Sequence, residues 1–235
     1  MRFTKFTAVS AIFAIIAFAT VGRAGAATIA HWTYEGATTP ADVTDNGTGP
    51  TVLPQFGSGT STGLHASAAS DWTTPSGNGS ENSLNSNNWA PGDYLQFQSS
   101  TVGLQDINVS WDQTRSSTGP TGFKLQYGTD GTTFTDSLVY TVLNNEIANG
   151  GTWNNTTFIP NYHFDVDLSS IAALDNQPAV YFRLTNTVTG TNVAGTSRVD
   201  NFTILGVVPE PATSLLLAIA GLALMGLARR LRLTT

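Results

Sequence analysis

Oxygen-bearing side chains near the two ends of the central region could hold a divalent cation. Glu35 closes the first run of strand-forming residues, and Asp200 and Asn201 lie in the last such run. Ca²⁺ takes six to eight oxygen ligands, including carboxylates and backbone carbonyls, so two carboxylates on adjacent strands could start a site. The residues therefore predict a structural Ca²⁺ at Glu35, Asp200 and Asn201. The alternative is that Asp200 and Asn201 cap or turn the strand and Glu35 is solvated.

Three tryptophans lie in polar surroundings, away from the alternating segments. They are Trp72, Trp89 and Trp153. An exposed indole can stack on a pyranose ring, so the three are candidate ligand-binding residues for a polysaccharide. The alternative is that each ring pins its own loop to the domain.

Residues that usually carry catalysis are sparse. The chain has no Cys, which excludes a thiol nucleophile, and His31, His65 and His163 are its only histidines. They belong to no zinc-binding or nucleophile motif. Asp165 and Asp167 share one face of a predicted strand, which fits glycoside hydrolysis and a solvent-facing edge equally well. We therefore expect no enzyme activity, with a glycoside-directed envelope hydrolase as the alternative.

Eight short runs in the centre of the chain are rich in strand-forming residues, and several alternate apolar and polar residues with a period of two. Leu95 and Phe97, for example, share one face of their run. This pattern is typical of strands with one buried face. The runs are 29–35, 93–98, 105–112, 122–127, 134–142, 162–168, 179–186 and 198–205.

Without helices between these runs, the pattern predicts an all-β fold, an antiparallel two-sheet sandwich of the jelly-roll type, over residues 27–206. Residues 36–92, rich in Gly, Ser, Thr, Asn and Pro, are predicted to be long loops with one or two short strands. Residues 128–131, Gly-Thr-Asp-Gly, predict a tight turn between two strands.

The charge of the central region excludes one class of partner. The formal net charge of the 235-residue chain is −6, but residues 27–206 carry fifteen acidic and four basic residues, a formal charge of −11. Such a field repels phosphate backbones, so we expect no nucleic-acid partner. The absence of Cys also excludes disulfides, which a domain of this length does not need.

The first 26 residues have the three parts of a secretory signal. A basic start precedes an apolar run, 7–21, and Ala24 and Ala26 supply the small residues of a cleavage site. The pattern predicts a signal peptide, 1–26, that engages the Sec machinery and is cut by signal peptidase after Ala26 or one residue later. The alternative is a permanent membrane anchor.

The last segment, 207–235, combines a short motif, an apolar run and a basic end. Its parts are Pro209, Glu210 and Pro211, the apolar run 212–228, and Arg229, Arg230 and Arg232 in the tail 229–235. Seventeen helical residues span about 25 Å, enough to cross a thin hydrocarbon layer. The arginines would stay on the cytoplasmic side. We therefore predict a C-terminal transmembrane helix that follows the two prolines.

This order of motif, helix and arginines resembles the PEP-CTERM sorting signal of Gram-negative bacteria. The resemblance implies that an exosortase, a membrane cysteine protease, recognises and processes the tail. Pro209, Glu210, Pro211 and the arginines would then be recognition residues and not catalytic ones. It also implies an exported protein of the cell envelope, anchored by the helix or extracellular after processing, in an organism that makes exopolysaccharide and biofilm. The alternatives are a plain membrane anchor and a eukaryotic lipid-anchor signal, whose tail normally lacks arginines.

Three parts of the central domain resemble domains commonly carried ahead of this tail. They are 119–127 followed by Asp130 and Gly131, then 181–184, and finally 198–202. These stretches resemble domains that look similar to carbohydrate-binding jelly rolls, in which acidic residues of the first and last strands often hold Ca²⁺. The resemblance implies a non-catalytic sandwich that binds exopolysaccharide. A membrane-anchored structural protein without a specific ligand is the further alternative.

Overall fold

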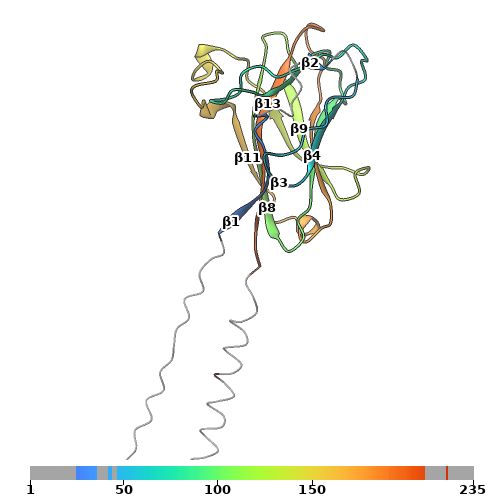
Figure 1. Cartoon of the computed structure of the whole chain (residues 1–235). Helices are drawn as coiled ribbons and strands as arrows, with labels where there is room; N and C mark the ends of the chain where they lie inside the picture. Colours follow the sequence, from blue (N-terminus) through green and yellow to red (C-terminus); the bar gives the residue numbers. More distant parts are fainter. Residues whose placement is uncertain (1–24, 36–41, 44–46, 210–220, 222–235) are drawn as a thin grey trace, which may run out of the picture. The chain divides into compact units, whose positions relative to one another are not determined.

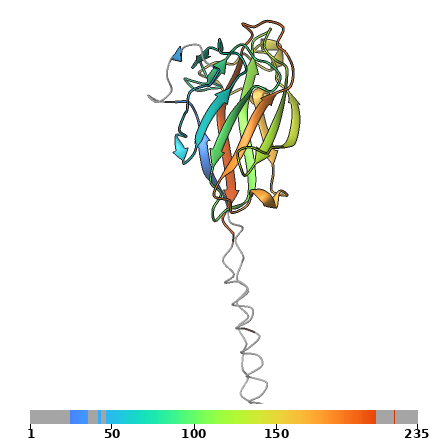
Figure 2. The ribbon, with the colours of Figure 1, turned by 90° about the vertical axis from the view of Figure 1, so that its right-hand side faces the viewer.

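The computed structural model describes residues 25–35, 42–43, 47–209 and 221. The chain divides into two compact units, and the unit Ala24–Pro209 is a sandwich of two antiparallel sheets (Figures 1 and 2). The predicted all-β fold class is confirmed. The described part of this unit contains no α-helix, only three short 3-10 turns: η1 Ile147–Asn149, η2 Pro160–Tyr162 and η3 Ala172–Leu174.

The first sheet, which we call sheet A, has the strand order β11-β8-β13-β6-β5-β2, with β1 added beside β13 and β3 beside β1. Its strands are β1 Ala26–Trp32, β2 Asp42–Val43, β3 Phe56–Gly57, β5 Trp72–Thr73, β6 Leu84–Ser86, β8 Gln105–Arg115, β11 His163–Asp167 and β13 Ser197–Val207. The long strand β13 is central. It pairs with β8 on one side, and with β6 and then β1 on the other.

The second sheet, sheet B, has the order β10-β9-β12-β7-β4. Its strands are β4 Thr60–Leu64, β7 Tyr94–Ser99, β9 Gly122–Gly128, β10 Thr135–Thr141 and β12 Val180–Asn186. The period of two sets its faces, because successive side chains of a strand point to opposite sides. In β7, Leu95 and Phe97 are buried against sheet A while Tyr94, Gln96 and Gln98 face outward.

All eight predicted strand regions are present, but the expectation for residues 36–92 is wrong in part. Five short strands, β2 to β6, occur there instead of one or two. Four of them have only two or three residues, too few to show an alternating pattern. These short strands form because other strands pair with them. For example, β5 and β6 pair with each other, and β6 also pairs with β13.

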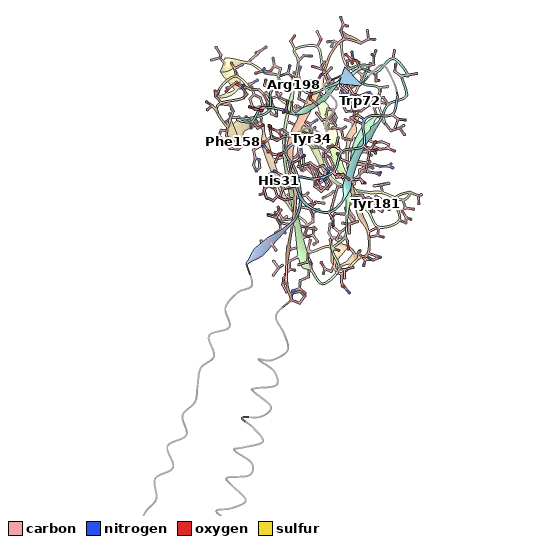
Figure 3. The ribbon with its side chains drawn as sticks, viewed as in Figure 1. His31, Tyr34, Trp72, Phe158, Tyr181 and Arg198 are labelled. Atoms are coloured by element: carbon pink, nitrogen blue, oxygen red, sulfur yellow. The ribbon has the colours of Figure 1, made fainter. Side chains whose placement is uncertain are left out.

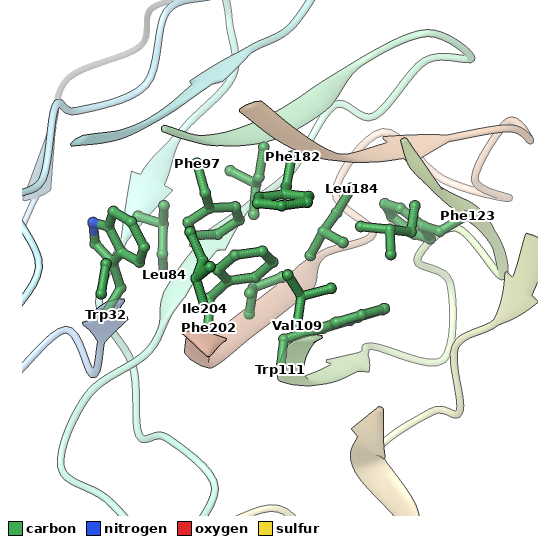
Figure 4. Close-up of a cluster of buried hydrophobic side chains, with 14 of the residues drawn as sticks. Trp32, Leu84, Phe97, Val109, Trp111, Phe123, Phe182, Leu184, Phe202 and Ile204 are labelled. Carbon is green, nitrogen blue, oxygen red and sulfur yellow. The ribbon is translucent and has the colours of Figure 1, made fainter. Parts of the chain in front are cut away.

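An aromatic core joins the two sheets (Figure 4). Phe97 of sheet B and Phe202 of sheet A stack with ring centroids 3.6 Å apart and an interplanar angle of 3°. The Trp32 ring meets both edge-on, at 5.3 and 6.1 Å. The buried apolar side chains of the main core extend from Ile29 to Ile204. Because this core lies within the unit, a fragment of residues 27–208 is expected to fold on its own.

The predicted turn between β9 and β10 is confirmed. Gly131 has a φ of +73°, which glycine adopts without steric cost. The carboxylate of Asp130 accepts the backbone N–H groups of Thr132 and Thr133 at 2.8 and 2.7 Å. These hydrogen bonds lower the pKa of Asp130 to about 2.

The first and last strands of the sandwich meet at one place. Ala26 pairs with Val207, so β1 begins beside the residue at which β13 ends. The predicted signal-peptide cleavage after Ala26 would leave Ala27 opposite Gly206 in this ladder. The other predicted cleavage residue, Ala24, lies outside the described residues, as does the predicted transmembrane helix 212–228 except for one position. Within the described part of the chain, no helix has the length and apolar character needed to span a membrane.

Candidate functional site

Asp200 directly precedes a β-bulge in the middle of β13, in which Asn201 and Phe202 lie opposite Trp111 of β8. The pairing register with β8 shifts between Asp200 and Thr203, and Asn201 has a φ of +52°. A bulge adds one residue to a strand, and asparagine tolerates this left-handed conformation better than most residues. Because their neighbours in β13 point into the core, the side chains of Asp200 and Asn201 lie on the outer face of sheet A, beside Asp112 of β8.

Asp112 lies at the centre of a polar cluster on that face. Its carboxylate is fully buried and faces Nδ1 of His163 at 2.7 Å. The side-chain amide of Asn201 donates to the other carboxylate oxygen at 2.9 Å. Burial raises the pKa of Asp112, while the hydrogen bonds from Asn201 and His163 oppose the rise. The sequence pattern did not single out Asp112, because its contacts depend on which strands are neighbours.

The carboxylate of Asp200 holds the segment between β5 and β6 against the sheet. One of its oxygens accepts the backbone N–H of Asn78 at 2.9 Å and the hydroxyl of Ser80 at 2.6 Å. The other accepts the backbone N–H of Asn201 at 2.7 Å. Burial raises the pKa of Asp200 to about 7, although the hydrogen bonds that it accepts lower it. Gly77 makes this approach possible, since a Cβ there would collide with the carboxylate.

Glu35 holds the same segment from the other side. Its carboxylate accepts the backbone N–H of Asn82 at 2.7 Å and the side-chain amide of Asn82 at 3.4 Å. The structure thus brings Glu35 and Asp200 to the same loop, between β5 and β6. Their carboxylates accept hydrogen bonds from N–H and O–H groups of that loop. Within the part of the chain that the structure describes, no group of three His, Cys, Asp or Glu side chains is arranged to hold a metal ion. Calcium at Glu35, Asp200 and Asn201 stays a prediction from the sequence.

The expectation that the three tryptophans are exposed is wrong. Trp72, Trp89 and Trp153 are 1%, 5% and 2% exposed, so their rings offer no face for a sugar. The indole N–H of Trp89 donates to the carbonyl of Ser86 at 2.9 Å, and that of Trp153 donates to the carbonyl of Ser76 at 2.7 Å. The alternative role is the one found: the rings fasten loops to the sandwich.

His65 lies between Trp72 and Trp89, beside two serines and an aspartate. Its Nδ1 faces the Ser70 hydroxyl at 2.9 Å and the Asp93 carboxylate at 3.9 Å. Its Nε2 faces the Ser86 hydroxyl at 3.4 Å, on the opposite side of the ring from Asp93. His65, Asp93 and both serines are buried, so the cluster presents no group to a substrate at the surface. Burial lowers the pKa of His65 to about 4, so the ring is neutral at pH 7 and packs between the two indole rings.

The outer face of sheet B carries an arrangement that the sequence analysis did not select. Arg183 of β12 lies between two rings, with its guanidinium carbon 3.8 Å from the centroid of Tyr94 and 3.7 Å from that of Phe134. Its Nε donates to the side-chain oxygen of Gln96 at 2.9 Å. Tyr181, two residues earlier in β12, lies on the same face (Figure 3). The alternation in β7 and β12 was the available signal for these residues.

Amide and hydroxyl groups continue this face on both sides of Arg183. Thr60 donates to the side-chain oxygen of Gln98 at 3.2 Å, and Thr185 donates to that of Gln126 at 2.7 Å. Gln126 in turn donates to Asp136 at 2.7 Å. The result is a polar surface with partly exposed rings, in which neighbouring side chains fix one another in place.

By fold, the described unit is an all-β protein with two antiparallel sheets. Residues 207–232 match the PEP-CTERM protein-sorting motif, and the chain therefore carries this sorting motif, as the resemblance predicted. Within the match are Pro209, Glu210, Pro211, Arg229, Arg230 and Arg232, of which the structure describes only Pro209. No curated protein matches the sequence.

Several solved structures are similar to this chain. The CBM22-1-CBM22-2 tandem domain of Xyn10C from Paenibacillus barcinonensis has 12% identity and a TM-score of 0.41, over 82% of this chain and 48% of that one. The CBM22-1-GH10 modules of a xylanase from Clostridium thermocellum have 14% identity and a TM-score of 0.40, over 76% and 28%. The K2 cleaved adhesin domain of Lys-gingipain has 15% identity and a TM-score of 0.41, over 76% and 97%. The chain thus spans less than half of the first two chains, and these likenesses assign no ligand or activity.

Proposed function

We propose that this protein is exported, sorted at the cell envelope through its C-terminal segment, and binds polysaccharide without catalysis on the outer face of sheet B. The sorting motif at residues 207–232 supports the first part. The observation that carries the second part is the guanidinium of Arg183, held between the rings of Tyr94 and Phe134.

A sugar chain needs flat apolar surface for its C–H groups and fixed polar groups for its hydroxyls. Partly exposed tyrosine rings supply the first, because each has an apolar body with a polar end. The guanidinium and the glutamine amides supply the second. Arg183 is already oriented by Gln96 and by two rings. Binding would therefore cost little side-chain entropy, which favours affinity.

The C-terminal segment has a separate role in the proposal. Signal peptidase releases the chain after export by the Sec machinery, the helix 212–228 halts in the membrane, and an exosortase-like protease acts at the Pro-Glu-Pro motif. The processed protein is then held at the envelope or released into an exopolysaccharide matrix. This order of events explains why one chain would carry both an export signal and a tail with arginines at its end.

The sorting step is tested by mass spectrometry of the protein from its own host. We expect the native product to lack the signal peptide and to be cut or modified near residues 209–211. Replacing Pro209, Glu210 and Pro211 with alanine is expected to leave the tail unprocessed, while the control Thr234→Ala, outside the matched motif, is processed normally. A native product found in the cytosol with both ends intact would contradict export and sorting together.

The binding step is tested with the fragment 27–208 on an array of neutral and acidic polysaccharides. We expect Arg183→Ala and Tyr181→Ala to weaken binding by about tenfold or more, because each removes a central contact. Asp165→Asn is the control, since Asp165 is exposed on the edge strand of the other sheet. A native fragment that binds no glycan, with or without Ca²⁺, would refute this part. Incubation of the bound glycan should release no reducing ends; their release would favour the hydrolase alternative.

A further inference from the structure

Cations are scarce in the sandwich, and three of its four basic side chains have partners. Arg115 donates to three backbone carbonyls at 3.0 Å. Lys124 pairs with Asp136 at 3.0 Å, and Arg183 has the contacts described above. Among the described residues, the guanidinium of Arg198 has no hydrogen-bond or ion-pair partner. In a region with fifteen acidic residues, a guanidinium left without a carboxylate needs an explanation.

Arg198 lies on the outer face of sheet A, at the end of β13 far from Val207 (Figure 3). Its neighbour in sequence, Val199, points into the core, so Arg198 points away from it. It is directly opposite Asn85 of β6 on one side and Thr114 of β8 on the other. The side chain is half-buried, and burial lowers the pKa of Arg198. A guanidinium that is partly removed from water gains more from an anionic partner than an exposed one does.

Asn85 has the opposite need, because its side-chain oxygen is an acceptor without a donor in the described part of the chain. It is only 9% exposed, and its side-chain N–H donates to the hydroxyl of Thr73 at 2.9 Å. Its side-chain oxygen is buried and has no hydrogen-bond partner. Side chains directly opposite each other on paired strands have Cβ atoms about 5 Å apart. A donor group and an acceptor oxygen, both without partners among the described residues, therefore lie side by side on one face.

A ligand that satisfies both groups must carry an anion and, next to it, a hydroxyl. Arginine binds carboxylates through two parallel N–H groups, and a buried amide oxygen requires an O–H or N–H donor. A hexuronic acid residue carries a carboxylate and a hydroxyl on adjacent ring carbons. We propose that Arg198 and Asn85 form a second site, on sheet A, that binds the carboxylate and the neighbouring C4 hydroxyl of a hexuronic acid residue at the non-reducing end of an acidic polysaccharide. The site is on the opposite sheet from Arg183 and does not depend on the sheet B site.

The negative charge of the domain helps to test this site, because it works against binding of any acidic polymer. A formal charge of −11 repels acidic polymers, so a preference for an acidic sugar cannot come from general attraction. The probe is trigalacturonic acid, whose non-reducing residue has a free C4 hydroxyl beside its carboxylate, and its fully methyl-esterified form is the neutral control. In calorimetry at about 0.15 M salt, where long-range repulsion is screened, we expect the fragment 27–208 to bind the acid at least about tenfold more tightly than the ester.

Arg198→Gln is expected to abolish this preference, and Asn85→Leu to weaken binding of the acid. Lys124→Gln is the matched control, because it also removes one cation but one that already pairs with Asp136, and it should leave the preference unchanged. In an NMR titration of the native fragment, which needs no variant to fold, the acid should shift the amide signals of residues 84–86 and 197–199. Three results would overturn the proposal: no binding of the acid, a preference that survives Arg198→Gln, or equal competition by inorganic phosphate, which would indicate only a general anion site.

Discussion

Replacement of Phe202 with alanine is expected to lower the free energy of unfolding by about 3–5 kcal/mol. Phe202 is fully buried, and its ring stacks on that of Phe97 across the two sheets at 3.6 Å. The rings of Trp32 and Trp111 also pack against it, at 6.1 and 6.3 Å. Removing the ring both loses buried apolar surface and leaves a cavity that these large rigid neighbours cannot close. Urea denaturation of the fragment 27–208 measures the change.

The matched control is Phe56→Ala. Phe56 is 63% exposed, so we expect a loss of less than about 1 kcal/mol. If both variants lowered the free energy of unfolding by the same small amount, the stacking of Phe97 on Phe202 would not hold the two sheets together. Because both candidate binding faces depend on the position of the strands, Phe202→Ala should also weaken glycan binding without touching a ligand.

Replacement of Asp200 with alanine is expected to cost about 2–4 kcal/mol at pH 7, because buried donors lose their acceptor. The donors are the backbone N–H groups of Asn78 and Asn201 and the hydroxyl of Ser80. The loop between β5 and β6 is held by this carboxylate, so its amides should exchange hydrogen faster in the variant. Asp165→Asn, exposed on β11, should change neither stability nor exchange. Unchanged protection of residues 77–82 in Asp200→Ala would show that other contacts hold the loop.

The pH dependence of stability distinguishes the contribution of Asp200 from that of His65. The pKa of Asp200 is raised by burial to about 7 in the folded state, from 3.8. Its contribution to stability is therefore complete below pH 3.8 and is lost as the pH rises through 7. The pKa of His65 is lowered by burial to about 4, from 6.5, so its contribution is complete above pH 6.5 and is lost as the pH falls. The two effects oppose each other between pH 4 and 6.5.

In Asp200→Asn the Asp200 effect is absent, so stability should fall more steeply on acidification from pH 6.5 to 4 than in the native fragment. Urea midpoints at several pH values measure this difference. Identical pH profiles for the variant and the native fragment would contradict the raised pKa of Asp200.

Local patterns of the sequence determined the eight longer strand regions, their faces and the sorting motif, but not the short strands within residues 36–92. A period of two in 93–98 or 179–186 places alternate side chains on opposite sides whatever the neighbouring strand is. The Pro-Glu-Pro motif with its apolar run and arginines is likewise contiguous, and the match at residues 207–232 confirmed it. The turn at Gly131 required only the local preference of glycine for positive φ.

Tertiary structure alone decided which of these faces meet. Asp112 lies beside His163 and Asn201 because β8 is paired with both β11 and β13, which come from distant parts of the chain. The burial of Trp72 and Trp89 similarly depends on short strands that only their partners stabilise. The neighbours Arg198 and Asn85 are separated by more than a hundred residues. Strand order and register arise from packing of the whole sandwich, and side-chain periodicity within one strand contains no information about either.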